Sequence, residues 1–85
     1  MNENKVLVSL SVPILERKYD VYFPINRKIH NVIDMLKTSL FDLSSGSFKV
    51  DQNYVLYNKE TGVAYDMNMI VRNTDIRNGS KIVML

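Results

Sequence analysis

A sequence of 85 residues is enough for one small domain, which buries only about 60 % of its unfolded surface and leaves little room for an enclosed active site. Cysteine is absent, which excludes a disulfide framework, a thiolate nucleophile and thiolate zinc sites, and is consistent with a reducing compartment. The formal net charge is +2, and the basic residues are scattered, so the sequence lacks the basic stripe with interleaved aromatics that favours nucleic-acid binding.

No apolar run approaches the roughly 20 residues of a membrane-spanning helix, and the polar start Met-Asn-Glu-Asn-Lys does not resemble a signal peptide. We therefore expect a cytoplasmic protein that does not insert into a membrane. Residues 1–4 are expected to form a flexible N-terminus, and residues 5–85 a single domain.

The first two elements are predicted to be strands joined by a turn. Apolar residues alternate with other residues from Lys5 to Val12 and again from Lys18 to Phe23, as in half-buried strands. Pro13 cannot donate to a ladder and should end the first strand, so the chain should turn at residues 14–17. The result would be an antiparallel hairpin. Its inward residues would be Val6, Val8, Leu10, Val12, Tyr19, Val21 and Phe23.

An amphipathic helix is predicted from Asn26 to Leu43, because its apolar side chains form one stripe at about 100° per residue. Pro24 should end the preceding strand, and the side chain of Asn26 is the expected N-cap. Gly46 should take the left-handed conformation that stops the helix. The stripe consists of Ile29, Val32, Ile33, Leu36 and Leu40, with Ile25 and Leu43 at its edge.

Shorter elements are predicted after the helix. Phe48 and Val50 should lie beneath the helix terminus. Strands are expected at residues 54–58, 63–65 and 80–85, with an irregular stretch at 66–75 and a turn at Asn78-Gly79. Met67, Met69, Ile70 and Val71 would anchor the irregular stretch, and Ile82 and Met84 would face inward from the last strand.

The predicted order is β-β-α-β-β-β, an α+β chain. The first and last strands both need a partner, and both can cover the helix stripe. If they pair side by side in the middle of the sheet, every long apolar strand gains a neighbour, and a right-handed crossover through the helix is compatible with this. That arrangement is the β-grasp, a mixed sheet with one helix packed across it.

With this order, the sequence resembles ubiquitin-like proteins over nearly all of residues 5–85. The resemblance is carried by Pro24 before the helix, by the spacing of Phe23, Ile29, Val32 and Leu36, and by the closing segment. That segment, Val71-x-x-x-Asp75-Ile76-x-x-Gly79-x-x-Ile82-x-Met84, is similar to the Asp-x-x-Ile-x-x-Gly-x-x-Leu-x-Leu ending of ubiquitin-like domains. Within the superfamily, the size and the start Lys-Val-x-Val resemble the YukD-like proteins of type VII (ESX-type) secretion in Gram-positive bacteria.

The resemblance implies a cytoplasmic accessory or regulatory component that is not an enzyme. Its partners would be cytosolic parts of the secretion membrane complex or its ATPase. We expect no cofactor, no metal and a monomer or weak homodimer. A sulfur carrier or modifier is one alternative, but such proteins act through a Gly-Gly tail, whereas this sequence ends Lys81-Ile82-Val83-Met84-Leu85, so we expect no covalent conjugation. A general β-grasp adaptor unrelated to secretion is another.

Catalytic groups are sparse. His30 is the only histidine, and Asp34 follows it one turn later. A carboxylate-oriented imidazole could act as a base, but no nucleophile or second ligand is placed to use it, so a solvent-facing pair is expected. No Gly-rich phosphate loop precedes the helix, so nucleotide binding is not expected.

The candidate site is an exposed apolar patch on the outer sheet face. If Val55 and Tyr57 face the helix, Leu56 faces solvent, and Val83 and Leu85 point outward beside it. Ile14 or Leu15 of the first turn would complete the patch. In ubiquitin the corresponding face is the main partner-binding surface, so the resemblance implies protein-binding roles for Leu15, Leu56, Val83 and Leu85.

The alternative to this patch is a one-residue slip of the third strand. The slip would put Tyr54 and Leu56 inside, and the patch would dissolve. The two readings differ at Leu56→Asp, which leaves the fold intact in the first reading and destroys it in the second.

Overall fold

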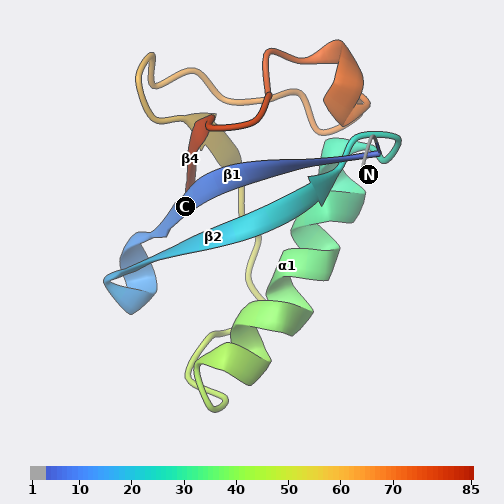
Figure 1. The fold of residues 1–85 in the computed structure, drawn as a ribbon. Helices are drawn as coiled ribbons and strands as arrows, with labels where there is room; N and C mark the ends of the chain where they lie inside the picture. Colours follow the sequence, from blue (N-terminus) through green and yellow to red (C-terminus); the bar gives the residue numbers. More distant parts are fainter. Residues whose placement is uncertain (1–3) are drawn as a thin grey trace.

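The computed structural model describes residues 4–85, and the expected flexible residues 1–3 lie outside the described part. Asn4 is included, and its carbonyl accepts a hydrogen bond of 2.9 Å from the Ile25 amide. The elements follow one another as Figure 1 shows. They are β1 (Lys5–Val12), η1 (Pro13–Leu15), β2 (Arg17–Pro24), α1 (Ile29–Leu43), β3 (Leu56–Asn58), η2 (Val71–Asn73) and β4 (Lys81–Met84), where η denotes a short 3-10 helix.

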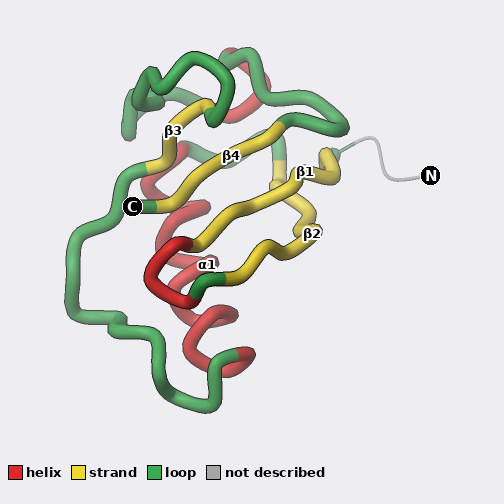
Figure 2. Tube along the Cα trace, turned by 90° about the vertical axis from the view of Figure 1, so that its left-hand side faces the viewer, coloured by secondary structure: helices red, strands yellow, loops and turns green. Residues whose placement is uncertain are grey.

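The two strands from opposite ends of the chain, β1 and β4, pair in the centre of the sheet. The strand order is β2-β1-β4-β3. β1 runs parallel to β4 and antiparallel to β2, and β3 is antiparallel to β4. Figure 2 shows α1 lying across one face of this sheet. The prediction of a mixed sheet with central terminal strands and one helix packed across it is confirmed.

The core lies between the sheet and α1. The helix stripe is buried as predicted, while Leu43 at its edge is exposed and Ile25 is half-buried. The buried residues are Val8, Leu10, Val12, Phe23, Ile29, Val32, Ile33, Leu36, Leu40, Phe48, Tyr54, Leu56, Val71, Ile76, Ile82 and Met84.

The first hairpin has the predicted facing. Lys5 pairs with Pro24 and Val12 with Arg17, so the two strands match along all of their length. The turn begins one residue earlier than expected, since Pro13 starts the 3-10 turn η1. Glu16 closes this turn in the left-handed conformation, with a φ of 53°, and its amide donates to the Pro13 carbonyl.

The prediction that Asn26 caps the helix is wrong. The helix starts at Ile29, and the N-cap is Lys28, which makes no side-chain capping hydrogen bond. The amide oxygen of Asn26 instead accepts from the Arg72 guanidinium. Two amides of the first helical turn donate to distant carbonyls: Ile29 to that of Met69 at 2.9 Å, and His30 to that of Met67 at 3.0 Å. A loop from far along the chain therefore satisfies helix donors that a local side chain usually would.

The helix ends in a left-handed stop, as predicted, but two residues share it. Ser45 adopts a φ of 53° and Gly46 a φ of 85°. The Gly46 amide donates to the Phe41 carbonyl at 2.8 Å, and the Ser45 amide to Asp42 at 3.2 Å. This is the paired bonding of a Schellman motif, in which Ser45 takes the position that glycine usually occupies. At 15 residues, the α-helix of the described part is too short and too polar to cross a membrane.

Phe48 lies beneath the helix terminus as predicted, but Val50 does not. Phe48 is buried, and its ring stacks on that of Tyr54 with centroids 4.8 Å apart. The Tyr54 hydroxyl donates to the Lys49 carbonyl at 2.6 Å. Val50 is 44 % exposed, because Tyr54 rather than Val50 fills the space beside Phe48.

The prediction that Leu56 faces solvent is wrong, and the slipped register is the one observed. Leu56 has no exposed surface and Tyr54 is buried, whereas Val55 and Tyr57 are half-buried. Leu56 pairs with Met84 across the sheet, so both side chains point toward the helix. The strand expected at 54–58 is limited to three residues, and the one expected at 63–65 is reduced to a single bridge between Tyr57 and Ala64.

The segment between β3 and β4 is anchored by fewer residues than predicted. Val71 is buried and Ile70 half-buried, but Met67 and Met69 are exposed. Earlier in this segment, Tyr65 contacts its far end: the Tyr65 hydroxyl donates to the Asp75 carboxylate at 2.7 Å. Burial, and then this hydrogen bond and the Asp75 charge, raise the pKa of Tyr65.

Leu36→Ala should lower the free energy of unfolding by about 2–5 kcal/mol, because it opens a cavity under α1. Met35→Ala, at the exposed neighbouring position, should change it by no more than about 0.5 kcal/mol. Urea denaturation of both variants measures the difference. Equal stabilities would contradict the packing of the helix stripe on the sheet.

Leu56→Asp should unfold the protein, since an unpaired carboxylate in the core costs several kcal/mol, a large part of the stability of a small domain. The matched change Leu85→Asp lies at a residue that is 58 % exposed and should leave the fold intact. Circular dichroism melting curves report both. A cooperative transition of Leu56→Asp at a melting temperature close to that of the unchanged protein would show that the Leu56 side chain faces solvent.

The hydrogen bond of Tyr65 should make stability fall at high pH. Because the pKa of Tyr65 is raised in the fold, only the unfolded state loses this proton as the pH passes about 10, so the free energy of unfolding decreases there. Tyr65→Phe should have a shallower decrease between about pH 9 and pH 11. Urea denaturation across this range compares the two proteins, and identical slopes would show that Tyr65 ionises equally in both states.

Candidate functional site

The candidate site is the face of the sheet that points away from α1, referred to here as the outer face. Because successive side chains on a strand point to opposite sides, burying one set against the helix leaves the other set on this face. Those residues are Lys5, Leu7, Ser9 and Ser11 of β1, Lys18, Asp20, Tyr22 and Pro24 of β2, Tyr57 of β3 with Val55 just before it, and Lys81 and Val83 of β4 with Leu85 just after it.

The strand registers align one outer-face residue from each of the four strands in a single row. Ser11 pairs with Lys18 on one side and with Val83 on the other, and Val83 pairs with Tyr57. Beyond this row, Leu85 and Val55 exchange two backbone hydrogen bonds of 2.8 and 3.0 Å. Val83, Leu85, Tyr57 and Val55 therefore form a continuous apolar area on β3 and β4.

Two of the four predicted binding residues lie in this area. Val83 is half-buried, and Leu85 is 58 % exposed; both are on the outer face as predicted. Leu56 is excluded from it, since it belongs to the core. That Val83 and Leu85 bind a partner stays a prediction.

The structure does not bring Leu15 to the outer face. Leu15 is half-buried and packs against the core, while its neighbour Ile14 is exposed. Both line a hollow that also includes Tyr19 and Leu43. The 3-10 turn η1 directs these two side chains toward the end of α1. A separate groove next to Val83 is bordered by Pro13 and Glu16 from this turn.

Sequence reasoning placed Val55 and Tyr57 on the wrong side of the sheet. The run from Tyr54 to Tyr57 has an apolar or aromatic residue at every position, so periodicity alone gives two equally regular facings. One usable signal is side-chain size. Each facing buries one tyrosine, Tyr54 or Tyr57, so the remaining difference is that one buries Leu56 and the other the smaller Val55. Burying the larger apolar side chain removes more apolar surface from water and favours Leu56 inside.

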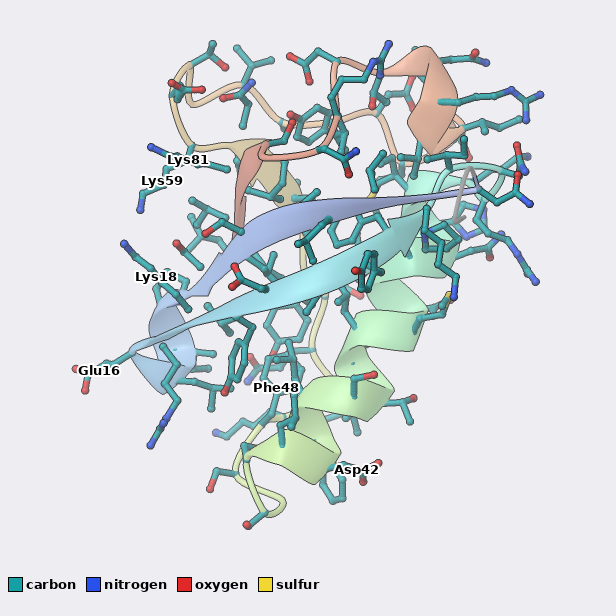
Figure 3. All side chains as sticks on the ribbon, viewed as in Figure 1. Glu16, Lys18, Asp42, Phe48, Lys59 and Lys81 are labelled. Carbon is teal, nitrogen blue, oxygen red and sulfur yellow. The ribbon has the colours of Figure 1, made fainter. Side chains whose placement is uncertain are left out.

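Three lysines border the apolar area. They come from three places in the chain: Lys18 is on β2, Lys81 is on β4, and Lys59 directly follows β3. Figure 3 shows their side chains projecting from the same side of the molecule. The Lys59 ammonium is within 3.5 Å of the Ser11 hydroxyl oxygen, to which it donates. The charge of Lys18, a contact with the Lys18 amine, and a smaller effect of Lys81 lower the pKa of Lys59.

The predicted pair of His30 and Asp34 lies in the first half of α1. His30 is half-buried near the start of α1, and Asp34 is exposed one turn further along. In residues 4–85, no three His, Asp or Glu side chains gather closely enough to hold a metal ion. What the outer face does provide is an apolar contact area flanked by positive charge.

No protein-family model matches the sequence, and no curated protein matches it either. Solved structures do match the fold. The ubiquitin-like domain of the Mycobacterium tuberculosis type VII secretion protein EccD1 has a TM-score of 0.73 at 12 % identity, covering 95 % of this chain and 97 % of that one. The EccD5 ubiquitin-like domain from Mycobacterium xenopi has a TM-score of 0.71 at 14 % identity, covering 95 % and 92 %.

A third match is part of a larger assembly. One chain of the MycP5-free ESX-5 inner membrane complex has a TM-score of 0.70 at 11 % identity, covering 96 % of this chain but 21 % of that one. Ubiquitin-like domains of other proteins match as well, among them that of Arabidopsis thaliana At2g32350, with a TM-score of 0.63 at 17 % identity, covering 96 % of this chain and 77 % of that one. At these identities, the similarity establishes the fold alone. The chain has the ubiquitin-like β-grasp fold, which it shares with the ubiquitin-like domains of type VII secretion EccD proteins.

Proposed function

We propose that this protein is a non-enzymatic protein-interaction module that serves as an accessory or regulatory component of a type VII secretion system. It works in the cytoplasm and belongs to the YukD-like proteins of Gram-positive bacteria. Its partners are cytosolic parts of the secretion membrane complex or its ATPase, which it binds without covalent conjugation and without entering the membrane.

The observation that carries the proposal is the apolar area on the outer face. Val83, Leu85, Tyr57 and Val55 are adjacent through strand pairing, and none of them is fully buried. Apolar side chains gathered on an exposed sheet face are typical of a contact surface. Protein partners could bury them on binding.

The assignment to secretion is supported by the structural neighbours. Domains of the same fold occur in EccD1 and EccD5, and a chain of the ESX-5 inner membrane complex includes a region of this fold. In a complex of that kind, a small module with an apolar outer face would contribute contacts rather than chemistry. Proteins with unrelated functions can have the same fold, so the proposal has to be tested by a functional assay.

The test is a secretion assay in the host. Deleting the gene should reduce export of the small helical substrates of the system into the medium, and the intact gene should restore it. The double variant Val83→Gln with Leu85→Gln should fail to restore export, because it removes apolar contact without adding charge. Immunoblots of medium and cell fractions measure export, and binding of the purified proteins to the cytosolic parts of the complex measures affinity.

The matched control is Val63→Gln with Leu43→Gln. It changes the same residue types at positions that are 64 % and 61 % exposed and lie outside the outer face. This control should restore export fully. Normal export without the gene would overturn the secretion role in favour of an adaptor unrelated to secretion. Equal loss from both double variants would overturn the assignment of the outer face.

A further inference from the structure

Positive charge is concentrated on one side of the apolar area. Ser11 is at the centre, with Lys18 paired beside it on β2 and Val83 on β4. Lys81 pairs with Ser9, two residues before Ser11 on β1. The backbone amide of Lys59 donates to the Lys81 carbonyl at 3.0 Å, so these two lysines are side by side. The tertiary structure thus gathers lysine side chains from positions 18, 59 and 81, with the Lys59 ammonium beside the Ser11 hydroxyl.

These charges repel one another in the free protein. The charge of Lys18, and to a smaller extent that of Lys81, lowers the pKa of Lys59. Two acidic residues lie nearby. Asp20 is on the outer face of β2, where it shares Ser9 as a neighbour with Lys81 but is two strands away from it. Glu16 is at the tip of the first turn and lines the same groove as Lys18 and Lys59. The three ammonium groups are therefore incompletely compensated.

A shallow groove lies directly beside this cluster. It has a volume of about 540 Å³. Pro13 and Val83 contribute apolar walls, and Lys18 and Lys59 stand at its border. Among the charged residues that line it, Arg17, Lys18 and Lys59 outnumber Glu16 by three to one. The groove therefore offers positive charge next to an apolar wall.

We propose that the outer face binds an acidic segment of a partner protein, in which carboxylates contact Lys18, Lys59 and Lys81 and a neighbouring apolar side chain rests on Val83 and Pro13. The inference rests on the proposed function and adds the chemistry of the partner to it. Binding such a segment relieves the repulsion among the lysines, and the attraction is charge-assisted hydrogen bonding at an exposed site.

A protein segment fits the cluster better than a nucleic acid. Nucleic-acid binding uses a basic track that follows several successive phosphates. Here the cluster of Lys18, Lys59 and Lys81 lies at one end of the face, and Asp20 on β2 separates it from the rest of that face. At the other end, Leu7 and Tyr22 pair with each other, and the positive charge comes from Lys5, which pairs with Pro24. A short acidic segment matches both the extent of the cluster and the adjoining apolar wall.

The experiment uses the whole 85-residue chain and a synthetic ten-residue peptide of alternating Leu and Asp, titrated by two-dimensional NMR. The expected result is chemical-shift change at Ser11, Lys18, Lys59, Lys81 and Val83. Affinity should fall as NaCl is raised from about 0.05 M to about 0.5 M, since exposed charges are screened. The pKa of Lys59 should rise when the peptide is bound, because carboxylates favour the charged amine.

Charge reversal provides the matched comparison. Lys59→Glu and Lys18→Glu should each weaken peptide binding by about three- to tenfold at low salt. Lys49→Glu makes the same change at an exposed loop residue outside the cluster and should bind like the unchanged protein. A peptide of alternating Leu and Asn should bind much more weakly. Equal binding of the Asn peptide, or equal losses for Lys49→Glu and Lys59→Glu, would overturn the proposal.

Two further outcomes separate this inference from the proposed function. If Val83→Gln with Leu85→Gln abolishes export while Lys18→Glu and Lys59→Glu restore it fully, the secretion role stands and the acidic partner is wrong. If a single-stranded oligonucleotide binds the same lysines more tightly than the Asp peptide at equal salt, the ligand is a nucleic acid and the proposal fails. If the lysine variants lose both peptide binding and export, the proposal is supported.

Discussion

The parallel pairing of β1 with β4 is the constraint on which the rest of this fold depends. It joins Ser9, Leu10 and Ser11 to Lys81, Ile82 and Val83, about 70 positions later in the chain. Closing so long a loop costs conformational entropy. Burial of Leu10 and Ile82 against α1 opposes that cost. The Asn78-Gly79 turn adds direct attachment, since the Asn78 side chain accepts from the Leu7 amide at 2.8 Å.

The same pairing creates the candidate binding surface. Once the inner side chains of β1 and β4 are committed to the helix, their neighbours must point outward, so Ser11 and Val83 become adjacent. The lysines that surround them come from the hairpin, from the residue after β3 and from β4. No short stretch of sequence shows this cluster. The apolar area and the positive charge are therefore products of topology, and a partner that binds there recognises the folded sheet rather than a linear motif.

The long connection from β3 to β4 has a role beyond linking two strands. Its carbonyls at Met67 and Met69 accept hydrogen bonds from the first amides of α1, and Val71 and Ile76 complete the core. The Tyr65 hydroxyl and the Asn58 amide both donate to the Asp75 carboxylate. A segment with little regular structure thus holds the start of the helix and one end of the sheet together through hydrogen bonds.

The sequence alone determined the elements whose pattern is local: the Val6-to-Phe23 hairpin, the helix stripe from Ile29 to Leu40, and the facing of Ile82 and Met84. The sequence also predicted that the first and last strands pair in the centre of the sheet, because each of these strands needed a neighbour. Only the tertiary structure decided the facing of Leu56, the true cap of the helix and the lysine cluster. Leu56 is inside because it pairs with Met84, and the helix amides are satisfied by carbonyls about 40 residues away. Period and propensity act over neighbouring residues, whereas these features depend on contacts between distant ones.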